Sequence, residues 1–192
     1  MFQEKIIQTI EASVRVKNEI CRDRALIEKI DQAAKTCIET FRNGGKILFC
    51  GNGGSAADAQ HLAAEFSGRF YKDRPPLYSE ALHVNTSYLT AVGNDYGYDQ
   101  VYSRMIKGIG KKGDILIGLS TSGNSQNIIH AFEAAHALGM ICIGFTGATG
   151  GKMAVLSDLL INVPSTDTPR IQESHITIGH ILCELVEKSL FP

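Results

Sequence analysis

The chain has no excess of charge of either sign and no long apolar run, and each absence excludes a class of protein. Its 192 residues carry 19 Lys and Arg against 20 Asp and Glu, a formal net charge of −1. Nucleic acids are bound through clustered basic residues, so this balance gives no case for DNA or RNA as a ligand. No uninterrupted apolar segment approaches the roughly 20 residues of a membrane-spanning helix, so we expect no membrane insertion. The first 20 residues carry charges throughout, which excludes a secretory leader.

Paired cysteines are also absent. The five cysteines are Cys21, Cys37, Cys50, Cys142 and Cys183, and no two of them form a CxxC pair. An odd, scattered set indicates reduced thiols in a cytoplasmic protein, not a disulfide framework or a thiolate zinc site. We expect each of them to be a small buried apolar side chain.

The length suits one domain over residues 1–192. Residues 1–44 carry apolar side chains at nearly helical spacing, with a break near residues 21–23, and end at Gly44-Gly45. A glycine pair is a fitting helix end, so we predict a helical lead-in before a core over residues 45–192. The lead-in packs either against a partner subunit or against the chain's own sheet, and the spacing does not decide between them.

The core alternates apolar strands with helices. Strands are predicted at 46–50, 80–84, 114–119, 141–146 and 159–163, helices at 56–67, 85–92, 100–107, 126–138 and 170–189, and loops or turns at 71–78, 93–97 and 147–151. Continuous apolar strands between helices indicate a parallel sheet covered on both faces. Right-handed crossovers then give an α/β fold of three layers, with a doubly wound, five-stranded parallel sheet.

A glycine-rich turn at residues 51–54 separates the first strand from the first core helix, with Ser55 at the expected N-cap. A strand, a glycine-rich turn and a helix N-terminus together form an anion site, most often for phosphate. The turn superficially fits the dinucleotide fingerprint. However, residues 83–85 provide no carboxylate for a ribose, and no GK[ST] follows, which argues against both a nicotinamide cofactor and a P-loop.

The segment Ser120-Thr121-Ser122-Gly123-Asn124-Ser125 follows the third strand and precedes a helix. Ligands bind at this edge of an open α/β sheet. Four hydroxyls and backbone N–H groups suit a phosphate monoester that is held and not transferred. The alternative is that these residues only cap the helix, and we expect one of them to do so.

His61 and Glu65 lie four residues apart and share one helix face just past the anion site. They could form a surface pair, part of a metal site, or a general base with its orienting partner. Their place behind a phosphate-type loop favours a functional role.

The last helix carries four polar residues, Gln172, Glu173, His175 and His180, among apolar ones. Polar groups on an apolar helix need partners. Glu173 and His180 lie nearly on one line, whereas Gln172 lies about 80° round the helix. Spacing alone leaves open whether Gln172 or Glu173 works with His180, and His175 is more easily a structural histidine.

Several motifs carry a family resemblance. They are Cys50-Gly51-Asn52-Gly53-Gly54-Ser55, Asp58-Ala59-Gln60-His61, Glu65, Gly68-Arg69-Phe70, Val92-Gly93-Asn94-Asp95-Tyr96-Gly97, Ser120 to Ser125, and Arg170-Ile171-Gln172-Glu173. Together they resemble the phosphoheptose isomerases, the sedoheptulose 7-phosphate isomerases of the sugar-isomerase (SIS) domain family, whose fold is flavodoxin-like. The similarity covers nearly the whole chain, including the helical lead-in.

The resemblance implies a cytoplasmic bacterial homotetramer with active sites between subunits, whose product feeds heptose into lipopolysaccharide or capsule. Substrate contacts would be Asn52, Gly53, Gly54, Ser55, Glu65, Arg69, Asn94, Asp95, Ser120, Thr121, Ser122, Ser125 and Gln172. Glu65 and His180 would be the acid/base pair. One Zn²⁺ per subunit would be bound by His61, Glu65, Gln172 and His180, which selects Gln172 over Glu173 by resemblance and not by geometry. One departure is visible, since Pro169 stands where some members carry an acidic residue, and Asp167 is a possible substitute.

The implied reaction is ketose–aldose isomerisation through a cis-enediol. Glu65 would remove the C1 proton and His180 would be the partner acid or base. A zinc-bound Glu65 is a poorer base, so either its coordination loosens during turnover or the metal is partly structural.

Two rivals share the fold. The DnaA initiator-associating adaptor has the same GNGGSA, DAQH, STSGNS and RIQE motifs; Gly68-Arg69 favours the isomerases, and the ending Leu190-Phe191-Pro192 favours the adaptor. A sugar-phosphate sensor without turnover usually carries a separate DNA-binding domain, and this chain has none.

Overall fold

The computed structural model describes all residues 1–192, and the order of elements follows the predicted alternation. The strands are β1 (Ile47–Gly51), β2 (Ser79–Ala81), β3 (Ile115–Ser120), β4 (Ile141–Thr146) and β5 (Leu159–Asn162). The α-helices are α1 (Phe2–Arg22), α2 (Arg24–Arg42), α3 (Gly54–Ser67), α4 (Thr86–Tyr96), α5 (Val101–Ile109), α6 (Gln126–Ala137) and α7 (Thr168–Leu190). Two short 3₁₀ helices, η1 (Tyr98–Gln100) and η2 (Gly151–Val155), were not predicted.

The five strands form one sheet in the order β2-β1-β3-β4-β5, and every neighbouring pair is parallel. The chain leaves β1 toward β2 on one side and returns to β3 on the other, so the direction of winding reverses between β1 and β3. In open α/β sheets this switch point, at the carboxyl ends of the strands, is where ligands bind. The predicted doubly wound parallel fold is confirmed.

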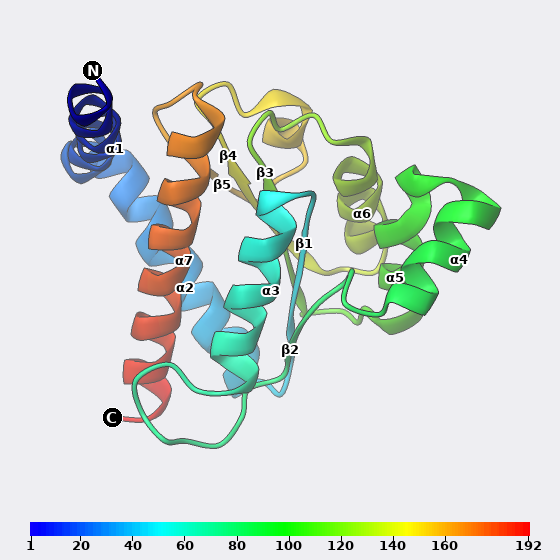
Figure 1. The fold of residues 1–192 in the computed structure, drawn as a ribbon. Helices are drawn as coiled ribbons and strands as arrows, with labels where there is room; N and C mark the ends of the chain where they lie inside the picture. Colours follow the sequence, from blue (N-terminus) through cyan, green and yellow to red (C-terminus); the bar gives the residue numbers. More distant parts are fainter.

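Helices cover both faces of the sheet (Figure 1). Alternate strand residues divide between two cores, since Ile47 and Phe49 pack with α2, α3 and α7, whereas Leu48 and Cys50 pack with α5 and α6. Burial of both faces explains why the strands read as continuous apolar runs. Cys37, Cys50, Cys142 and Cys183 are buried as expected, but the expectation was wrong for Cys21, which is exposed on α1.

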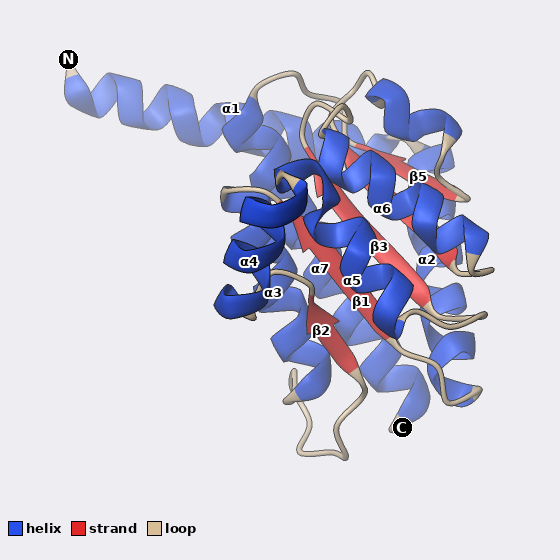
Figure 2. Ribbon diagram, turned by 90° about the vertical axis from the view of Figure 1, so that its right-hand side faces the viewer, coloured by secondary structure: helices blue, strands red, loops and turns tan.

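The lead-in divides at Asp23, whose carboxylate accepts the N–H of Leu26 at 3.0 Å and caps α2. α2 packs against α7 and the sheet through residues such as Ala33 and Cys37. α1 instead projects away from the body of the molecule (Figure 2). Its apolar residues remain exposed, Phe2 by 86%, Ile6 by 56% and Ile10 by 59%. The alternative of packing on the chain's own sheet therefore holds for α2, whereas α1 leaves an apolar surface uncovered.

Two helix boundaries and one expected helix cap show the clearest differences from the prediction. α3 begins at Gly54 behind an N-cap at Gly53, which has a φ of +56°, so Ser55 is a buried first-turn residue and not the cap. The N-cap of α6 is Ser125, but its hydroxyl caps nothing and pairs with Ser120 instead. α4 continues through the predicted turn and stops only at Gly97, where φ is +85°.

β2 is shorter than predicted, with three residues in place of five. It is an edge strand whose only partner is β1, and the pairing ends at Ala81 opposite Phe49. None of the helices is both long enough and apolar enough to span a membrane.

Candidate active site

Two helices bring together three of the predicted functional side chains. On α3, His61 Nε2 lies 2.9 Å from Glu65 Oε1, and on α7, His180 Nε2 lies 3.4 Å from His61 Nε2. Their ligand atoms all lie within 4.8 Å of one another, and the side chain of His61 is half exposed. We call these three residues the trio. They form one accessible group of two imidazoles and a carboxylate.

A glycine permits this approach of the two helices. A Cβ on Gly179 would lie 2.4 Å from Leu62 Cδ1, so a larger residue here would push α7 away from α3. Gly179 and Leu62 directly neighbour His180 and His61 in the sequence. The contact therefore fixes the distance between the two imidazoles. Sequence reasoning missed Gly179, although a glycine inside an apolar helix often marks close packing.

The surroundings of His180 disfavour its charged form. Burial lowers the pKa of His180, and the neighbouring His61 lowers it further, while Glu65 opposes both. The ring of Phe70 lies 5.7 Å from that of His180 and covers one side of it. A neutral imidazole is able to accept or donate a proton, and it is also the form that binds a metal.

The donor set of the trio fits a divalent metal. Two imidazole nitrogens and a carboxylate oxygen are a common zinc donor set, and here all three ligand atoms lie within 4.8 Å of one another. Gln172, the fourth predicted ligand, lies elsewhere within this chain. A Cβ on Gly54 would lie 2.7 Å from Gln172 Nε2, and Gly54 precedes His61 by seven residues, about 10 Å along the helix. The amide thus faces the start of α3 and not the trio.

The two other polar residues of the last helix have structural partners. Glu173 pairs with Arg170, whose guanidinium also donates to Thr9 O on α1 at 3.0 Å, so Glu173 faces α1 and not His180. His175 is fully buried and donates from Nε2 to Thr146 O at 3.1 Å; burial lowers its pKa to about 4. The prediction that His175 is structural agrees with this position.

The first glycine-rich loop has the conformation that an anion site needs. A Cβ on Gly51 would lie 2.4 Å from Ser55 O, so only glycine fits where the chain turns from β1 into α3. The backbone N–H groups of Asn52 and Gly53 have no acceptor within the chain. The side chain of Asn52 pairs with Asn127 at the start of α6, a residue that sequence reasoning did not single out.

The phosphate-type loop at residues 120–125 lies beside it, at the carboxyl end of β3. Ser120 Oγ and Ser125 Oγ lie 2.9 Å apart, and Ser122 Oγ accepts the N–H of Asn124 at 3.2 Å. Gly123 has a φ of +66° and touches the loop at residues 147–151, since its Cβ would lie 2.1 Å from Gly150 O. The loop is thus held in place from outside, and none of its own residues is basic.

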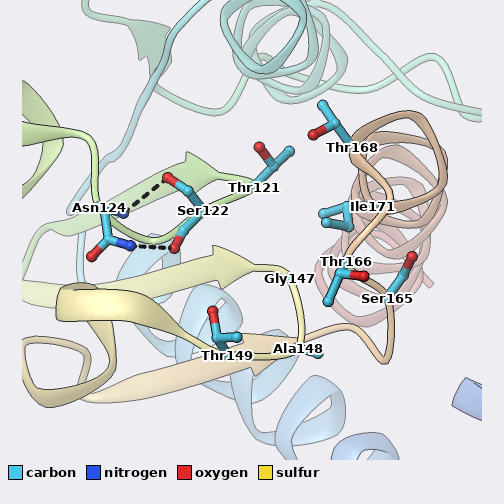
Figure 3. Close-up of a pocket in the computed structure, with 10 residues that line it drawn as sticks. All are labelled: Thr121, Ser122, Asn124, Gly147, Ala148, Thr149, Ser165, Thr166, Thr168 and Ile171. Carbon is cyan, nitrogen blue, oxygen red and sulfur yellow. Dashed lines mark hydrogen bonds between the residues drawn. The ribbon is translucent and has the colours of Figure 1, made fainter.

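A cavity of about 270 Å³ opens next to this loop, between the ends of β3, β4 and β5 and the start of α7 (Figure 3). It is lined by Thr121, Ser122, Asn124, Gly147, Ala148, Thr149, Ser165, Thr166, Thr168 and Ile171. The lining has six hydroxyls and no charged side chain. Sequence reasoning missed Thr149, Ser165, Thr166 and Thr168, whose position at the carboxyl ends of β4 and β5 was the available signal. Asp167, the suggested substitute at Pro169, lies on the opposite side of this wall, facing α1.

The remaining predicted contacts lie at the periphery. Asn94 Nδ2 donates to Asp95 Oδ1 at 2.9 Å at the exposed end of α4. Arg69 is exposed just after α3 and makes no hydrogen bond or ion pair within the chain. Neither segment touches the trio or the phosphate-type loop through a hydrogen bond. Asp58, one turn before His61, was not singled out; burial raises its pKa, and its Oδ2 is buried without a partner.

A second group of possible metal ligands, His136, Cys142 and Asp158, lies at the amino ends of β4 and β5. Asp158 Oδ2 already accepts the N–H of Cys142 at 2.7 Å and lies 3.2 Å from His136 Nε2. Burial raises the pKa of the Cys142 thiol to about 12. These groups are engaged in a structural contact, on the edge of the sheet opposite the candidate site.

Comparison with known proteins shows the family of the chain. Residues 11–147 match the SIS domain family, so the chain belongs to that family. A phosphoheptose isomerase from Aneurinibacillus thermoaerophilus is 58% identical over 182 residues, which cover 95% of this chain and 92% of the relative. The solved phosphoheptose isomerase of Neisseria gonorrhoeae is 46% identical with a TM-score of 0.92, covering 98% of this chain and all of the other. That of Francisella tularensis is 39% identical with a TM-score of 0.93, covering 98% and 99%.

Within the SIS domain family, the chain groups with the phosphoheptose isomerases over nearly its full length, and the resemblance drawn from the motifs is confirmed. It is therefore an enzyme of the sugar-phosphate isomerase class.

Proposed function

We propose that the chain interconverts sedoheptulose 7-phosphate and D-glycero-D-manno-heptose 7-phosphate through an enediol or enediolate, as the first step of nucleotide-activated heptose synthesis for lipopolysaccharide or capsule. The observation that carries this proposal is the pairing of Glu65 and His180 in one accessible group on two helices. An isomerase of this type needs a base that removes a proton from carbon and a second group that moves a proton between the oxygens. The trio supplies both.

The phosphate is held by the loop at residues 120–125. Ser120, Thr121, Ser122 and Ser125 surround the start of α6 with hydroxyls, and the helix N-terminus adds its partial positive charge. The loop itself contains no lysine or arginine, so its hydroxyls and backbone N–H groups would anchor the phosphate. The open-chain sugar then extends from this anchor toward the acid/base groups.

The proton movements follow from the two side-chain types. The Glu65 carboxylate removes the proton from C1 of the ketose; the C–H electron pair forms the C1=C2 double bond, and the carbonyl π pair moves to O2. Returning a proton to C2 gives the aldose, while His180 moves a proton between O1 and O2. Positioned proton transfer of this kind contributes about 10²–10⁴-fold to the rate.

A zinc ion fits the donors of His61, Glu65 and His180, and when bound it would supply charge stabilisation for the oxygens of the enediolate. Since a coordinated carboxylate would be a weaker base, either the coordination of Glu65 would loosen during turnover or the metal would be partly structural. His61 then keeps Glu65 oriented through the 2.9 Å contact. Gln172 joins this set only if its amide leaves the start of α3.

We further propose that the chain, a single SIS domain over residues 1–192, works as a homotetramer with active sites between subunits. The apolar residues of α1 support this, because Phe2, Ile6 and Ile10 are more than half exposed in the single chain. Exposed apolar surface of this kind marks an interaction site. Ile181 and Leu185, close to His180 on α7, are also part-exposed and would bring the same interface near the trio.

The experiment that tests the function is turnover of sedoheptulose 7-phosphate by the purified chain, with and without a chelator, beside a DnaA pull-down. Turnover without DnaA capture supports the isomerase. Capture of DnaA without turnover would replace it with the adaptor. The ending that resembles the adaptor has a packing role here, because the ring of Phe191 lies 5.6 Å from the Arg74 guanidinium.

A further inference from the structure

The side chain of Asn52 joins two substrate loops through a reciprocal pair of hydrogen bonds. Its Nδ2 donates to Asn127 Oδ1 at 2.9 Å, and Asn127 Nδ2 donates back to Asn52 Oδ1 at 2.8 Å. Asn127 is the second residue of α6, two positions after Ser125, and is only 2% exposed. The pair therefore ties the first glycine-rich loop to the segment that ends the phosphate-type loop.

Two tyrosines complete the attachment of the first loop. Tyr98 in η1 donates its hydroxyl to Asn52 Oδ1 at 3.1 Å, and the buried Tyr102 donates to Gly51 O. Tyr98 follows the end of α4, where Asn94 and Asp95 lie. Asn52 is thus the meeting point of three chain segments that the resemblance places around the substrate.

The hydrogen-bonding capacity of Asn52 is nearly exhausted by these contacts. An amide oxygen has two lone pairs, and here one accepts from Asn127 and the other from Tyr98. One of the two Nδ2 hydrogens is also used. The backbone N–H groups of Asn52 and Gly53 remain free, so the first loop offers the substrate its backbone rather than the Asn52 oxygen.

We propose that Asn127 is a positioning residue for the isomerisation and acts through Asn52. Its buried amide sets the distance between the free N–H groups of the first loop and the phosphate-type loop. The phosphate-type loop anchors the phosphate of the substrate, and the first glycine-rich loop contacts the part of the sugar nearer the reacting carbons. A change in the distance between the loops therefore moves the reacting carbons relative to the acid/base pair. The inference rests on the proposed function, because it concerns that same site.

Replacement of the amide has a defined expected result. Asn127→Ala lowers kcat/KM for sedoheptulose 7-phosphate by about 10- to 100-fold, the loss typical of a misplacement near 1 Å. The inhibition constant of inorganic phosphate stays close to the wild-type value, because the hydroxyls at residues 120–125 are unchanged. Asn52→Ala gives a similar loss, and the double variant is no worse than the poorer single variant, since both act through one contact.

The matched control is Gln126→Ala. Gln126 precedes Asn127 on the same helix, is exposed, and its amide contacts His130 and not the first loop. This variant keeps wild-type kinetics. If Asn127→Ala fails to fold, Tyr98→Phe tests the same contact from an exposed position and gives a smaller fall in kcat/KM.

Three results would overturn the inference. The first is wild-type turnover by Asn127→Ala, the second a double variant that shows the product of the two single losses, and the third a parallel weakening of phosphate inhibition, which would indicate a general loosening of α6. A wild-type chain without any turnover would instead overturn the proposed function and remove the basis of this inference, so the two failures are distinguishable.

Discussion

His180 Nε2 faces His61 Nε2 at 3.4 Å, although the two residues are 119 positions apart in the chain. With Glu65 Oε1 2.9 Å from His61, two imidazole rings and a carboxylate converge at one accessible point. This group has the donor atoms that a metal site or a proton-transfer site needs.

The acid/base roles predict the outcome of two conservative substitutions. Glu65→Gln and His180→Gln each keep the shape of the side chain but remove its proton chemistry. We expect kcat for sedoheptulose 7-phosphate to fall by about 10²–10⁴-fold in each variant. Glu133→Gln, an exposed carboxylate on α6, serves as the control and keeps its turnover. Near-normal turnover by either variant of the trio would remove the assigned role.

Metal removal tests the trio as a ligand set. We expect a chelator to lower turnover and added Zn²⁺ to restore it. In a calorimetric Zn²⁺ titration, His61→Ala should weaken binding by more than the roughly 10–100-fold that loss of an outer-shell partner costs. His136→Ala, in the second donor group at the opposite sheet edge, should keep the wild-type affinity. If His136→Ala weakened Zn²⁺ binding and His61→Ala did not, the metal site would lie at that edge of the sheet.

Substitution of Gly54 by alanine should affect stability and activity differently. A Cβ there would meet the flexible amide of Gln172 at 2.7 Å, so Gly54→Ala displaces Gln172 and not the backbone. Alanine is favoured over glycine in a helix by about 0.5–1 kcal/mol, so the melting temperature should stay level or rise. We expect KM to increase, because Gln172 and the start of α3 both belong to the proposed substrate site. Gly108→Ala on α5, where a Cβ meets nothing within 4 Å, should give the stability change alone.

The carboxylate of Glu187 predicts a pH dependence of stability. Burial alone would raise its pKa, but the N–H groups of Lys72, Tyr71 and Phe70, with Arg74, outweigh burial and lower it. A carboxyl group with a lowered pKa stabilises the fold above its unfolded pKa of about 4.3, and that contribution is lost as pH falls through the folded pKa. Thermal unfolding should therefore show the wild-type chain losing stability below about pH 4.

Glu187→Gln tests this contribution at neutral pH. The variant leaves the buried Arg74 without its counter-charge, which should lower the free energy of unfolding by roughly 3–5 kcal/mol. The loss of stability below about pH 4 should also become smaller than in the wild-type chain. Glu184→Gln, one turn earlier on the outer face of α7, should unfold within about 0.5 kcal/mol of wild type. An unchanged acid limb in Glu187→Gln would contradict the prediction.

The exposed face of α1 predicts the oligomeric state. Ile6→Glu with Ile10→Glu places charges on apolar positions that are 56% and 59% exposed in the single chain. If these residues are buried between subunits, light scattering should show the homotetramer dissociating, and turnover should fall with it. Gln8→Glu, an exposed polar position on the same helix, should leave the assembly intact. A tetramer that survives both isoleucine substitutions would place the interface elsewhere.

The sequence by itself determined the order and type of the main elements and the two loops that resemble phosphate sites. These are local properties: apolar runs such as 115–119 must be buried on both faces, and glycine at positions such as Gly51 is required by the backbone turn itself. The family motifs are also short stretches of neighbouring residues, and the comparisons confirm the family resemblance that they indicated.

Only the tertiary structure decided which polar residues meet. Helical spacing left Gln172 and Glu173 as equal partners for His180, whereas the fold directs Glu173 toward α1 and Gln172 toward Gly54. The meeting of His61 with His180 depends on the contact of Gly179 with Leu62, and the fixing of Asn52 depends on Asn127 on another helix. Such contacts join residues far apart in sequence, so their distances are set by how the helices pack on the sheet and not by any local pattern.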